Sequence, residues 1–501
     1  MSVLRTTTLH KSFFTTALVG VLLSTSAAHA DEPAGDEEEL REAPSEPEKH
    51  YLRTAVFEAL ALAGGTAWYW IDRERQVADW DFPSWSSRLT TDVMRYDNNP
   101  FHVNFAWHAG NGSSFHLIGR ANGLSLWESV GAGLLTSLVW EYALEYREKV
   151  SVNDLIFTTG SGLPMGEFLH VMGRFFHEDE RASQWAAARW TAGFPMALSR
   201  ALDGDAAPSL ANAGPIWHTM HLGYELGVSS ATVSDDGADH ILHSVHIDGR
   251  FVRMPGYLET GVWSRRFTNA EFTRATLDAS GASGGSAVKI FADTTLLGWY
   301  GQQMHAGSEF LSNATMVGVS MAYRYRREQI GAWDDRVGVL HLPGLAADAH
   351  LSRGNVSLDA SARVHADFAG VNALSNDEWN AAYPNEVGKT VLRKMGYYYG
   401  YGGSVALAAE LRYRSVFLGG SLWAARYSSD EGLDRTQEDL TVDQESSDQI
   451  LDVEAHLRIE DLPHDLYVET RFESRQRDAK LEEFETSATL RRYTLGVGVR
   501  F

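Results

Sequence analysis

Carboxylates and imidazoles gather between residues 102 and 177 of this chain, at spacings that could support metal binding or acid/base chemistry. Glu141 and Glu145 are four residues apart in a helical pattern, which puts them on one helix face. One stripe of the next helical pattern holds four more polar residues: Glu167, His170, Arg174 and His177. Three histidines precede both segments: His102, His108 and His116. Side chains of these types, brought together from neighbouring helices, could hold a metal ion or form an acid/base pair.

A plainer interpretation of the same residues stays open. A glutamate pair at this spacing is usually solvated surface, and scattered histidines usually satisfy buried backbone groups. The spacing matches no known metal motif such as H-E-x-x-H, so the sequence specifies neither a metal nor a cofactor. Gly160-Ser161-Gly162 and Gly112-Ser113-Ser114 do not make a nucleophile elbow of the type G-x-S-x-G, and Gly281 to Gly285 has the composition of a loop. No Walker loop and no dinucleotide-binding fingerprint is present.

About seventy residues, from about 98 to 167, carry an ordered set of these and other residues. The set comprises Asn104, His108 with Gly110, Gly119-Arg120-Ala121-Asn122-Gly123, Ser129, Trp140-Glu141-Tyr142, Glu145, Ser151 with Asp154, and Gly166-Glu167. It resembles the bacterial family called domain of unknown function 3943. Prolines tend to follow the asparagine and the histidine in that family, whereas Phe105 and Ala109 stand here. The resemblance implies no activity.

Six residues follow as candidates for catalysis. The resemblance implies that His108, Glu141, Glu145, Asp154 and Glu167 belong to a site, and the polar stripe adds His170.

The elements that must position these residues are helical. Helix-like apolar patterns cover 51–71, about 124–148 and about 164–177, and a weaker one lies near 181–202. Pro164 suits a first helical turn. The sequence therefore predicts a helical domain over 51–205, either in the periplasm or as a plug in the lumen of a barrel.

After Pro215 the pattern changes to the strict alternation of half-buried strands. Clear runs cover 217–228, 314–326, 355–368, 403–414, 451–459 and 492–501. A soluble sandwich could give the same alternation. Three features favour a transmembrane β-barrel over 215–501: strands that reach the roughly 9–11 residues needed to cross a bilayer, charges on the polar face, and the terminal Phe501. The fold class is thus α+β, with helices followed by an antiparallel barrel.

The number of strands that the pattern indicates is odd, which does not suit a closed bacterial barrel. Thirteen strand starts can be counted, at 217, 241, 256, 270, 287, 314, 336, 355, 391, 416, 449, 465 and 487. Bacterial barrels of one chain have an even number, so we expect twelve strands, with fourteen as the alternative. With the C-terminus in the periplasm, we expect short inner turns at 461–464 and near 415. Outer connections are expected near 476–485 and over 428–448.

The N-terminus and the composition indicate where the protein resides. Residues 1–30 read as a secretory signal peptide ending in Ala28-His29-Ala30, and residues 31–50 as an acidic disordered tether. The chain has no cysteine. Its net charge of −23 argues against nucleic acid as a partner, because binding to phosphates needs lysine and arginine. We expect the outer membrane of a Gram-negative cell, with its lipids and the barrel-assembly machinery as partners. The small-molecule or lipid ligand is unknown.

Three functions remain open at this point. The first is a binding or transport role in the envelope, because the polar strand faces accompany an apolar helical segment. The second is an outer-membrane enzyme that acts on lipid or envelope glycan through His108 or His170 with a glutamate partner. The third is a purely structural envelope protein.

Overall fold

The computed structural model describes most of the chain after residue 47. The described residues are 48–72, 83–178, 189–191, 193–204, 216–233, 236–282, 284–307, 309–331, 333–386, 391–430 and 444–501. The expected signal peptide, nearly all of the acidic tether, and most of the 428–448 connection lie outside these residues.

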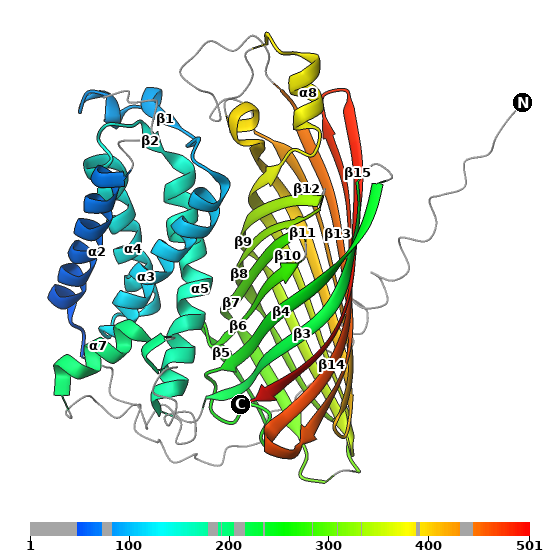
Figure 1. Ribbon diagram of the computed structural model, residues 1–501. Coiled ribbons are helices and arrows are strands. Elements are labelled where there is room, and N and C mark those ends of the chain that lie inside the picture. Colours follow the sequence, from blue (N-terminus) through cyan, green and yellow to red (C-terminus); the bar gives the residue numbers. More distant parts are fainter. Residues whose placement is uncertain are drawn as a thin grey trace, which may run out of the picture. The chain divides into compact units, whose positions relative to one another are not determined.

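Helices form the first part of the described chain (Figure 1). The α-helices are α2 (Tyr51–Asp72), α3 (His108–Ala121), α4 (Leu126–Val139), α5 (Val152–Glu178) and α7 (Phe194–Asp203). Short turns are η3 (Ser87–Leu89), η4 (Thr91–Val93), η5 (Val103–Trp107) and η6 (Trp140–Leu144). A capping box fixes the start of α4, because Ser125 and Glu128 bond each other's main-chain N–H groups. We call α2 to α5 with their connections the helical module.

One helix differs from its prediction. We expected Pro164 in a first turn, but α5 begins at Val152 and contains Pro164 in its interior. The expectation was wrong because residues 158–162, Thr-Thr-Gly-Ser-Gly, are weak helix formers that hide the first turns from the pattern. Packing against other elements stabilises these turns instead.

Twelve antiparallel strands close into a barrel, as the sequence predicted. They are β3 (Trp217–Val233), β4 (Asp236–Val252), β6 (Phe272–Ala282), β7 (Gly285–Met304), β8 (Ser312–Ile330), β9 (Trp333–Arg353), β10 (Val356–Asn372), β11 (Tyr397–Tyr413), β12 (Val416–Ser429), β13 (Ser446–Leu462), β14 (Leu466–Leu481) and β15 (Phe484–Arg500). β15 pairs with β3, and β7 pairs with β8, which completes the ring.

The thirteenth strand of the count is real but lies outside the ring. It is β5 (Gly261–Phe267), which among the described strands pairs with β7 alone, over its last residues from Gly298 to Met304. Two further helical turns, α8 (Asn376–Ala382) and η10 (Val391–Met395), lie between β10 and β11, and η11 (Pro463–Asp465) joins β13 to β14. A two-residue strand pair, β1 (Met94–Arg95) with β2 (Val150–Ser151), lies in the helical module.

The turns obey the expected order only in part. The inner turns near 415 and 463 are short, as expected. The outer connection expected near 476–485 is instead a tight turn, because β14 extends to Leu481 and β15 begins at Phe484. A long connection containing β5 lies at the C-terminal end of the barrel, where only short turns were expected.

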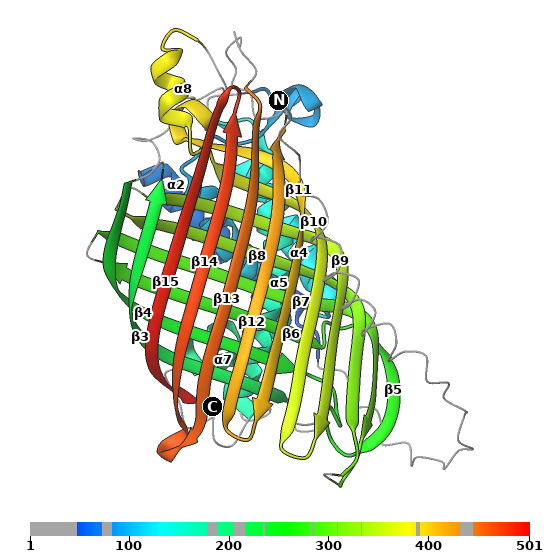
Figure 2. The same cartoon turned by 90° about the vertical axis from the view of Figure 1, so that its right-hand side faces the viewer.

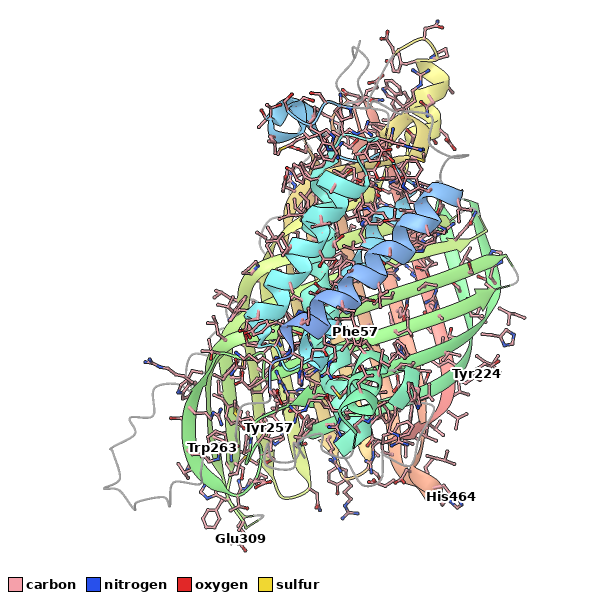
Figure 3. The ribbon with its side chains drawn as sticks, turned by 90° about the vertical axis from the view of Figure 1, so that its left-hand side faces the viewer. Phe57, Tyr224, Tyr257, Trp263, Glu309 and His464 are labelled. Atoms are coloured by element: carbon pink, nitrogen blue, oxygen red, sulfur yellow. The ribbon has the colours of Figure 1, made fainter. Side chains whose placement is uncertain are left out.

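Alternation along the strands gives the barrel an apolar exterior and an interior that holds many charged side chains. An apolar cluster that includes Val337, Val371 and Trp379 also lies in the interior. Ion pairs join strands that are not neighbours in the sheet, so they must cross the interior. His221 of β3 bonds Glu460 of β13 at 3.0 Å, Arg363 of β10 bonds Asp293 of β7 at 3.0 Å, and Arg477 of β14 bonds Asp335 of β9 at 2.9 Å. The outward positions are apolar and exposed on β3 and on β11 to β15; Tyr224 in Figure 3 is one example.

The helical module lies on the outer wall of the barrel, where α5 contacts β4 and β6 to β9 (Figures 1 and 2). Its partners are outward-facing: Phe251, Thr294 and Phe368 are neighbours in sequence of the inward-facing Arg250, Asp293 and Asp367. The lumen position that we considered for the helices is therefore not the one in this structure, because ion pairs already occupy the interior. Among the described helices, none is long and apolar enough to cross a membrane.

Two apolar clusters hold the module to the wall. The first, which we call the docking cluster, combines residues of the module with outward residues of β8 to β11 and with Val391 of η10. Its members are Tyr96, Phe101, Phe105, Ala109, Phe157, Tyr323, Tyr325, Leu340, Phe368, Val391, Tyr397 and Tyr399. The second lies nearer the C-terminal end and joins Phe168 and Phe175 of α5 to Met220 and Phe251 of the barrel. Phe501 packs against this second cluster, and its N–H donates to Met220 O at 2.9 Å.

Candidate functional site

Glu141 and Glu145 lie at the end of α4, where the helix widens into the π-turn η6. The Glu145 N–H donates to Trp140 O at 2.9 Å, the five-residue spacing of a π-turn. Arg88 of η3 is almost completely buried and satisfies the main-chain carbonyls that this end leaves open. Its guanidinium donates to the carbonyl oxygens of Tyr142, Tyr146, Glu145 and Glu141, the first three at 3.1, 3.2 and 3.3 Å.

Asp154 comes to the same place from the first turn of α5. The β1–β2 pair brings residues 94–97 beside the start of α5, in the register Met94 to Val150. There, Asp97 N–H donates to Asn153 Oδ1 at 2.7 Å, and the Asn153 amide donates to Asp154 Oδ1 at 2.6 Å. These contacts fix the direction of the Asp154 carboxylate.

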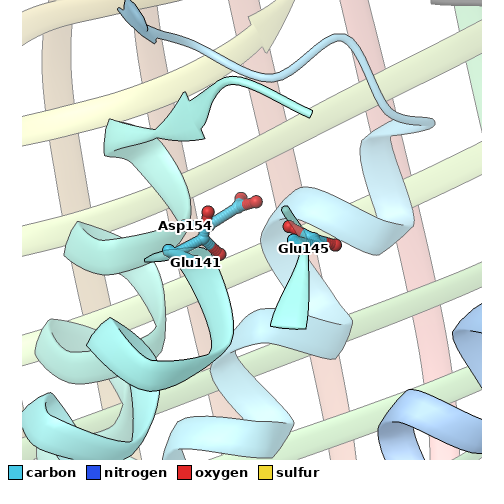
Figure 4. A group of neighbouring side chains, drawn as sticks. All are labelled: Glu141, Glu145 and Asp154. Atoms are coloured by element: carbon cyan, nitrogen blue, oxygen red, sulfur yellow. The ribbon is translucent and has the colours of Figure 1, made fainter. Parts of the chain in front are cut away.

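Glu141, Glu145 and Asp154 form what we call the carboxylate cluster (Figure 4). One carboxylate oxygen from each residue lies within 4.8 Å of the others, and all three residues are buried. Ser151 N–H donates to Glu141 Oε2 at 3.1 Å. Burial, reinforced by the charges of Glu145 and Asp154, raises the pKa of Glu141 well above its usual range. The cluster therefore disfavours three bare negative charges.

His108, the first residue of α3, adjoins this cluster. Its Nε2 lies 3.3 Å from Asp154 Oδ1, and its Nδ1 lies 3.2 Å from Thr158 Oγ1. Because both ring nitrogens have partners, the imidazole is placed to orient Asp154 or exchange a proton with it, rather than to ligate an ion directly.

Glu167 belongs to a second, separate group. It is fully buried and accepts from His116 Nε2 and Arg120 Nε at 3.0 Å each, and from Arg253 Nη2 at 2.7 Å. Burial alone would raise the pKa of Glu167, but the two arginines and the His116 hydrogen bond hold it well below its usual range. Arg253 follows β4, so this carboxylate also ties the helical module to the barrel.

His170 lies one turn beyond Glu167 and is also buried. Burial, together with the charge of Arg120, lowers the pKa of His170 well below its usual range, so the ring is neutral near pH 7. No hydrogen bond to its Nδ1 is found within the described part of the chain. His170 is therefore an interior histidine beside the Glu167 ion pairs.

The structure thus divides the six candidates into two places. His108, Glu141, Glu145 and Asp154 converge, whereas Glu167 and His170 lie thirteen or more residues further along α5, about 20 Å away at 1.5 Å per residue. Both groups lie outside the barrel lumen. Sequence reasoning did not single out Arg88 or Arg253 as partners of these groups. Both are isolated in sequence, and no spacing pattern signals their role.

Three carboxylates of this kind offer the oxygen ligands that hard divalent cations prefer. A cation held there would offset the repulsion within the cluster. The Glu167 group, by contrast, is already neutralised by arginines, which makes it a structural ion-pair network rather than a binding site.

A comparison with known protein families separates the helical part of the chain from the barrel. Residues 93–197 match the Domain of unknown function (DUF3943). The resemblance expected over residues 98–167 is therefore confirmed, and the match extends beyond it on both sides. It includes every candidate site residue and ends before the first strand of the barrel. No curated protein matches the chain.

Several solved structures resemble the chain at low identity. They include the NanC porin (8% identity, 55% of this chain and 98% of that chain covered, TM-score 0.22), OccK2 (OpdF) of Pseudomonas aeruginosa (8%, 57% and 98%, TM-score 0.15), and a loop L8 deletion mutant of OmpT, an outer membrane protein of Vibrio cholerae (7%, 58% and 100%, TM-score 0.19). At these TM-scores the likenesses carry no argument about function. The outer-membrane type of this barrel follows from its own closed, even-numbered strand order and apolar exterior.

Proposed function

We propose that this outer-membrane barrel protein has a binding role in the cell envelope, exercised by a divalent-cation site in its helical module. Glu141, Glu145 and Asp154 supply the ligands, and His108 orients Asp154. The observation that carries the proposal is the meeting of three buried carboxylates within 4.8 Å, beside an imidazole 3.3 Å from one of them.

The surroundings of the cluster support binding rather than a solvated surface. Buried carboxylates that repel one another are costly unless a proton or a cation compensates them. Arg88 is a buried cation beside Glu141 and Glu145, and its guanidinium donates to their main-chain carbonyls, which fixes their backbone in place. The oxygens come from two elements, η6 and α5, which gives the site a defined geometry.

Of the binding and transport roles expected from the sequence, the barrel interior favours binding. Ion pairs cross the lumen near both ends and at mid-height, as Arg477–Asp335, Arg363–Asp293 and His221–Glu460 illustrate. A cavity of about 220 Å³ remains between the strands, lined by Arg326, Asp452 and Arg475 among others. This interior supports a closed barrel that serves as a platform for the helical module.

Titration of the purified, metal-depleted protein with Mn²⁺, followed by electron paramagnetic resonance, tests the cation site. We expect one Mn²⁺ bound per chain, and loss of that binding by at least tenfold in a Glu141→Gln, Glu145→Gln variant, because two of the three charged ligands are removed. Glu128→Gln is the matched control, since Glu128 caps α4 without joining the cluster. Equal binding by wild type and double variant, or none by wild type, would contradict the proposal.

A second candidate function is an outer-membrane enzyme acting on lipid or envelope glycan. The observation in its favour is the His108–Asp154 pair, an arrangement that can move a proton next to a bound cation. A His108→Gln variant that binds Mn²⁺ like wild type but loses turnover of a radiolabelled membrane lipid or glycan would favour this function. If wild type and variant leave the composition of labelled outer membranes equally unchanged, binding alone remains.

A further inference from the structure

The outward surface of α2 and α4 has the reverse of the pattern expected for a helix in water. From Leu52 to Ile71, every exposed residue of α2 is apolar, aromatic or glycine: Leu52, Ala55, Val56, Ala59, Leu60, Ala61, Ala63, Gly64, Ala67, Trp68 and Ile71. The exposed residues of α4 are of the same kind: Trp127, Gly131, Leu134, Leu135 and Val139. We call these two sets together the apolar helix face. An exposed surface of this size and uniformity marks an interaction site.

Beyond the first turn of each helix, the charged residue of α2 and several polar residues of α4 are turned inward. Glu58 is the one charged residue of α2 between Arg53 and Asp72, and it is only 8% exposed. Thr136 of α4 donates to Glu58 Oε2 at 2.8 Å. Ser129 and Ser137 of α4 are buried as well. Helices that hide their polar groups from the surroundings and expose their carbon-rich side chains are suited to an apolar solvent.

The position of the module on the barrel indicates that this apolar surrounding is the lipid bilayer. α5 follows the outer wall along its length: Phe157 lies 5.5 Å from Phe368 between ring centres, Thr294 Oγ1 donates to Pro164 O at 3.3 Å, and Phe175 lies 5.6 Å from Phe251. From Phe157 to Phe175 the helix rises about 27 Å at 1.5 Å per residue, close to the roughly 30 Å thickness of a bilayer's hydrocarbon. The module therefore covers the height of wall that lipid covers elsewhere on the barrel.

We infer that the apolar helix face contacts the lipid of the outer membrane, so that the helical module lies beside the barrel at the depth of the bilayer. The face continues the apolar band of the barrel, whose outward residues on β3 and on β11 to β15 are exposed in the same way. α2 has 22 residues, about 33 Å in length, and lies on the side of the module away from the barrel (Figure 3). The barrel, rather than the hydropathy of any one helix, holds the module in place. This inference does not depend on the cation site.

The absence of cysteine from the chain allows a direct test with single spin labels. Leu60→Cys and Leu135→Cys report on the apolar helix face, where the native leucines are 64% and 63% exposed. Leu495→Cys on β15 is the matched lipid-facing control, with 62% exposure. Asp465→Cys, in the exposed turn between β13 and β14, is the water-facing control. Each variant is labelled with a nitroxide and reconstituted into vesicles of phosphatidylethanolamine and phosphatidylglycerol.

Power saturation with oxygen and with a water-soluble nickel chelate then distinguishes lipid from water. We expect the labels at 60 and 135 to match the label at 495: more accessible to oxygen, and at least several-fold less accessible to nickel than the label at 465. Nickel accessibility equal to that at 465 would overturn the inference, because the face would then be in water. Exclusion of both reagents would overturn it too, since a second copy of the chain would then cover the face. Heat-modifiable migration of the barrel on gels confirms that each variant is folded.

Discussion

Glu141 and Glu167 are both buried carboxylates of the helical module, but their neighbours act on the charge in opposite directions. Around Glu141, burial and two further carboxylates raise the pKa. Around Glu167, Arg120 and Arg253 more than offset burial and lower it. The second arrangement contains two arginines that neutralise its carboxylate, and we propose that a bound cation has this part in the first. This contrast is why we propose binding for one group and a structural role for the other, although spacing and resemblance make both equal candidates.

The second group predicts how the stability of the helical module depends on pH. The pKa values of His116 and His170 are lowered by burial, so the unfolded chain binds protons that the folded chain does not. Their contribution is complete above the unfolded histidine value of about 6.5 and is lost as the pH falls. The contribution of Glu167, whose pKa is also lowered, is lost at still lower pH, below its unfolded value of about 4.3.

Thermal unfolding followed by circular dichroism at 222 nm, in detergent micelles, measures this dependence. Between pH 7.5 and 5, we expect the free energy of unfolding to fall by up to about 1.4 kcal/mol per pH unit for each histidine. A His170→Gln variant should show a smaller slope over the same interval. An unfolding temperature that is flat from pH 7.5 to 5 would contradict the assignment of neutral, buried rings.

At the scale of elements, the docking of η5 and α5 on β8 to β11 is what places the site. Phe105 is fully buried in the docking cluster, and its ring fills the space above Gly338 and Gly370, where a Cβ atom would collide with it. Tyr323 donates to Phe105 O, and the Asn104 amide donates to Tyr397 and Tyr399 at 2.9 and 2.6 Å.

Truncation of this aromatic ring tests the docking. Phe105→Ala should cost about 3–5 kcal/mol, because it removes a fully buried ring and leaves a cavity. We expect a lower unfolding temperature of the helical signal at 222 nm, with unchanged heat-modifiable migration of the barrel. Trp107→Ala is the matched control in the same turn, since Trp107 is exposed and should change stability little. Equal effects of the two variants would argue against the docking cluster.

The strands could be predicted from the sequence, whereas the position of the helices could not. The strands and their number followed from alternation and from the even-number rule, because most outward positions are apolar and most charged side chains of the strands point inward. The place of the helices did not follow, for a physical reason: Phe251, Leu340 and Phe368 face α5 or η5, but an outward apolar residue looks the same in sequence whether a helix or lipid covers it. His108, Glu141 and Asp154 were found from the family resemblance, whereas Arg88 carries no local signal.

At the scale of the whole molecule, the barrel interior predicts electrical behaviour. Cross-lumen pairs of Arg326 with Asp452, Arg363 with Asp293 and Arg477 with Asp335 fill the interior with side chains. In planar bilayers, wild type should therefore give no steady open-pore current. Replacement of the three arginines by alanine should give resolvable conductance steps, if the strands stay closed. Large, stable steps from wild type would favour an open pore and contradict a closed platform.

A closed barrel carries the helical module, with its carboxylate cluster, on its outer wall, and a cross-link between α5 and β9 tests this arrangement. Gly160 of α5 faces Leu340 of β9, whose neighbour His341 points into the lumen. A Gly160→Cys, Leu340→Cys variant treated with a short thiol cross-linker should give an internally linked chain, visible as a shift on a denaturing gel. A Gly160→Cys, His341→Cys variant should not. Linkage through position 341 and not through 340 would put the helix inside the barrel and contradict the account.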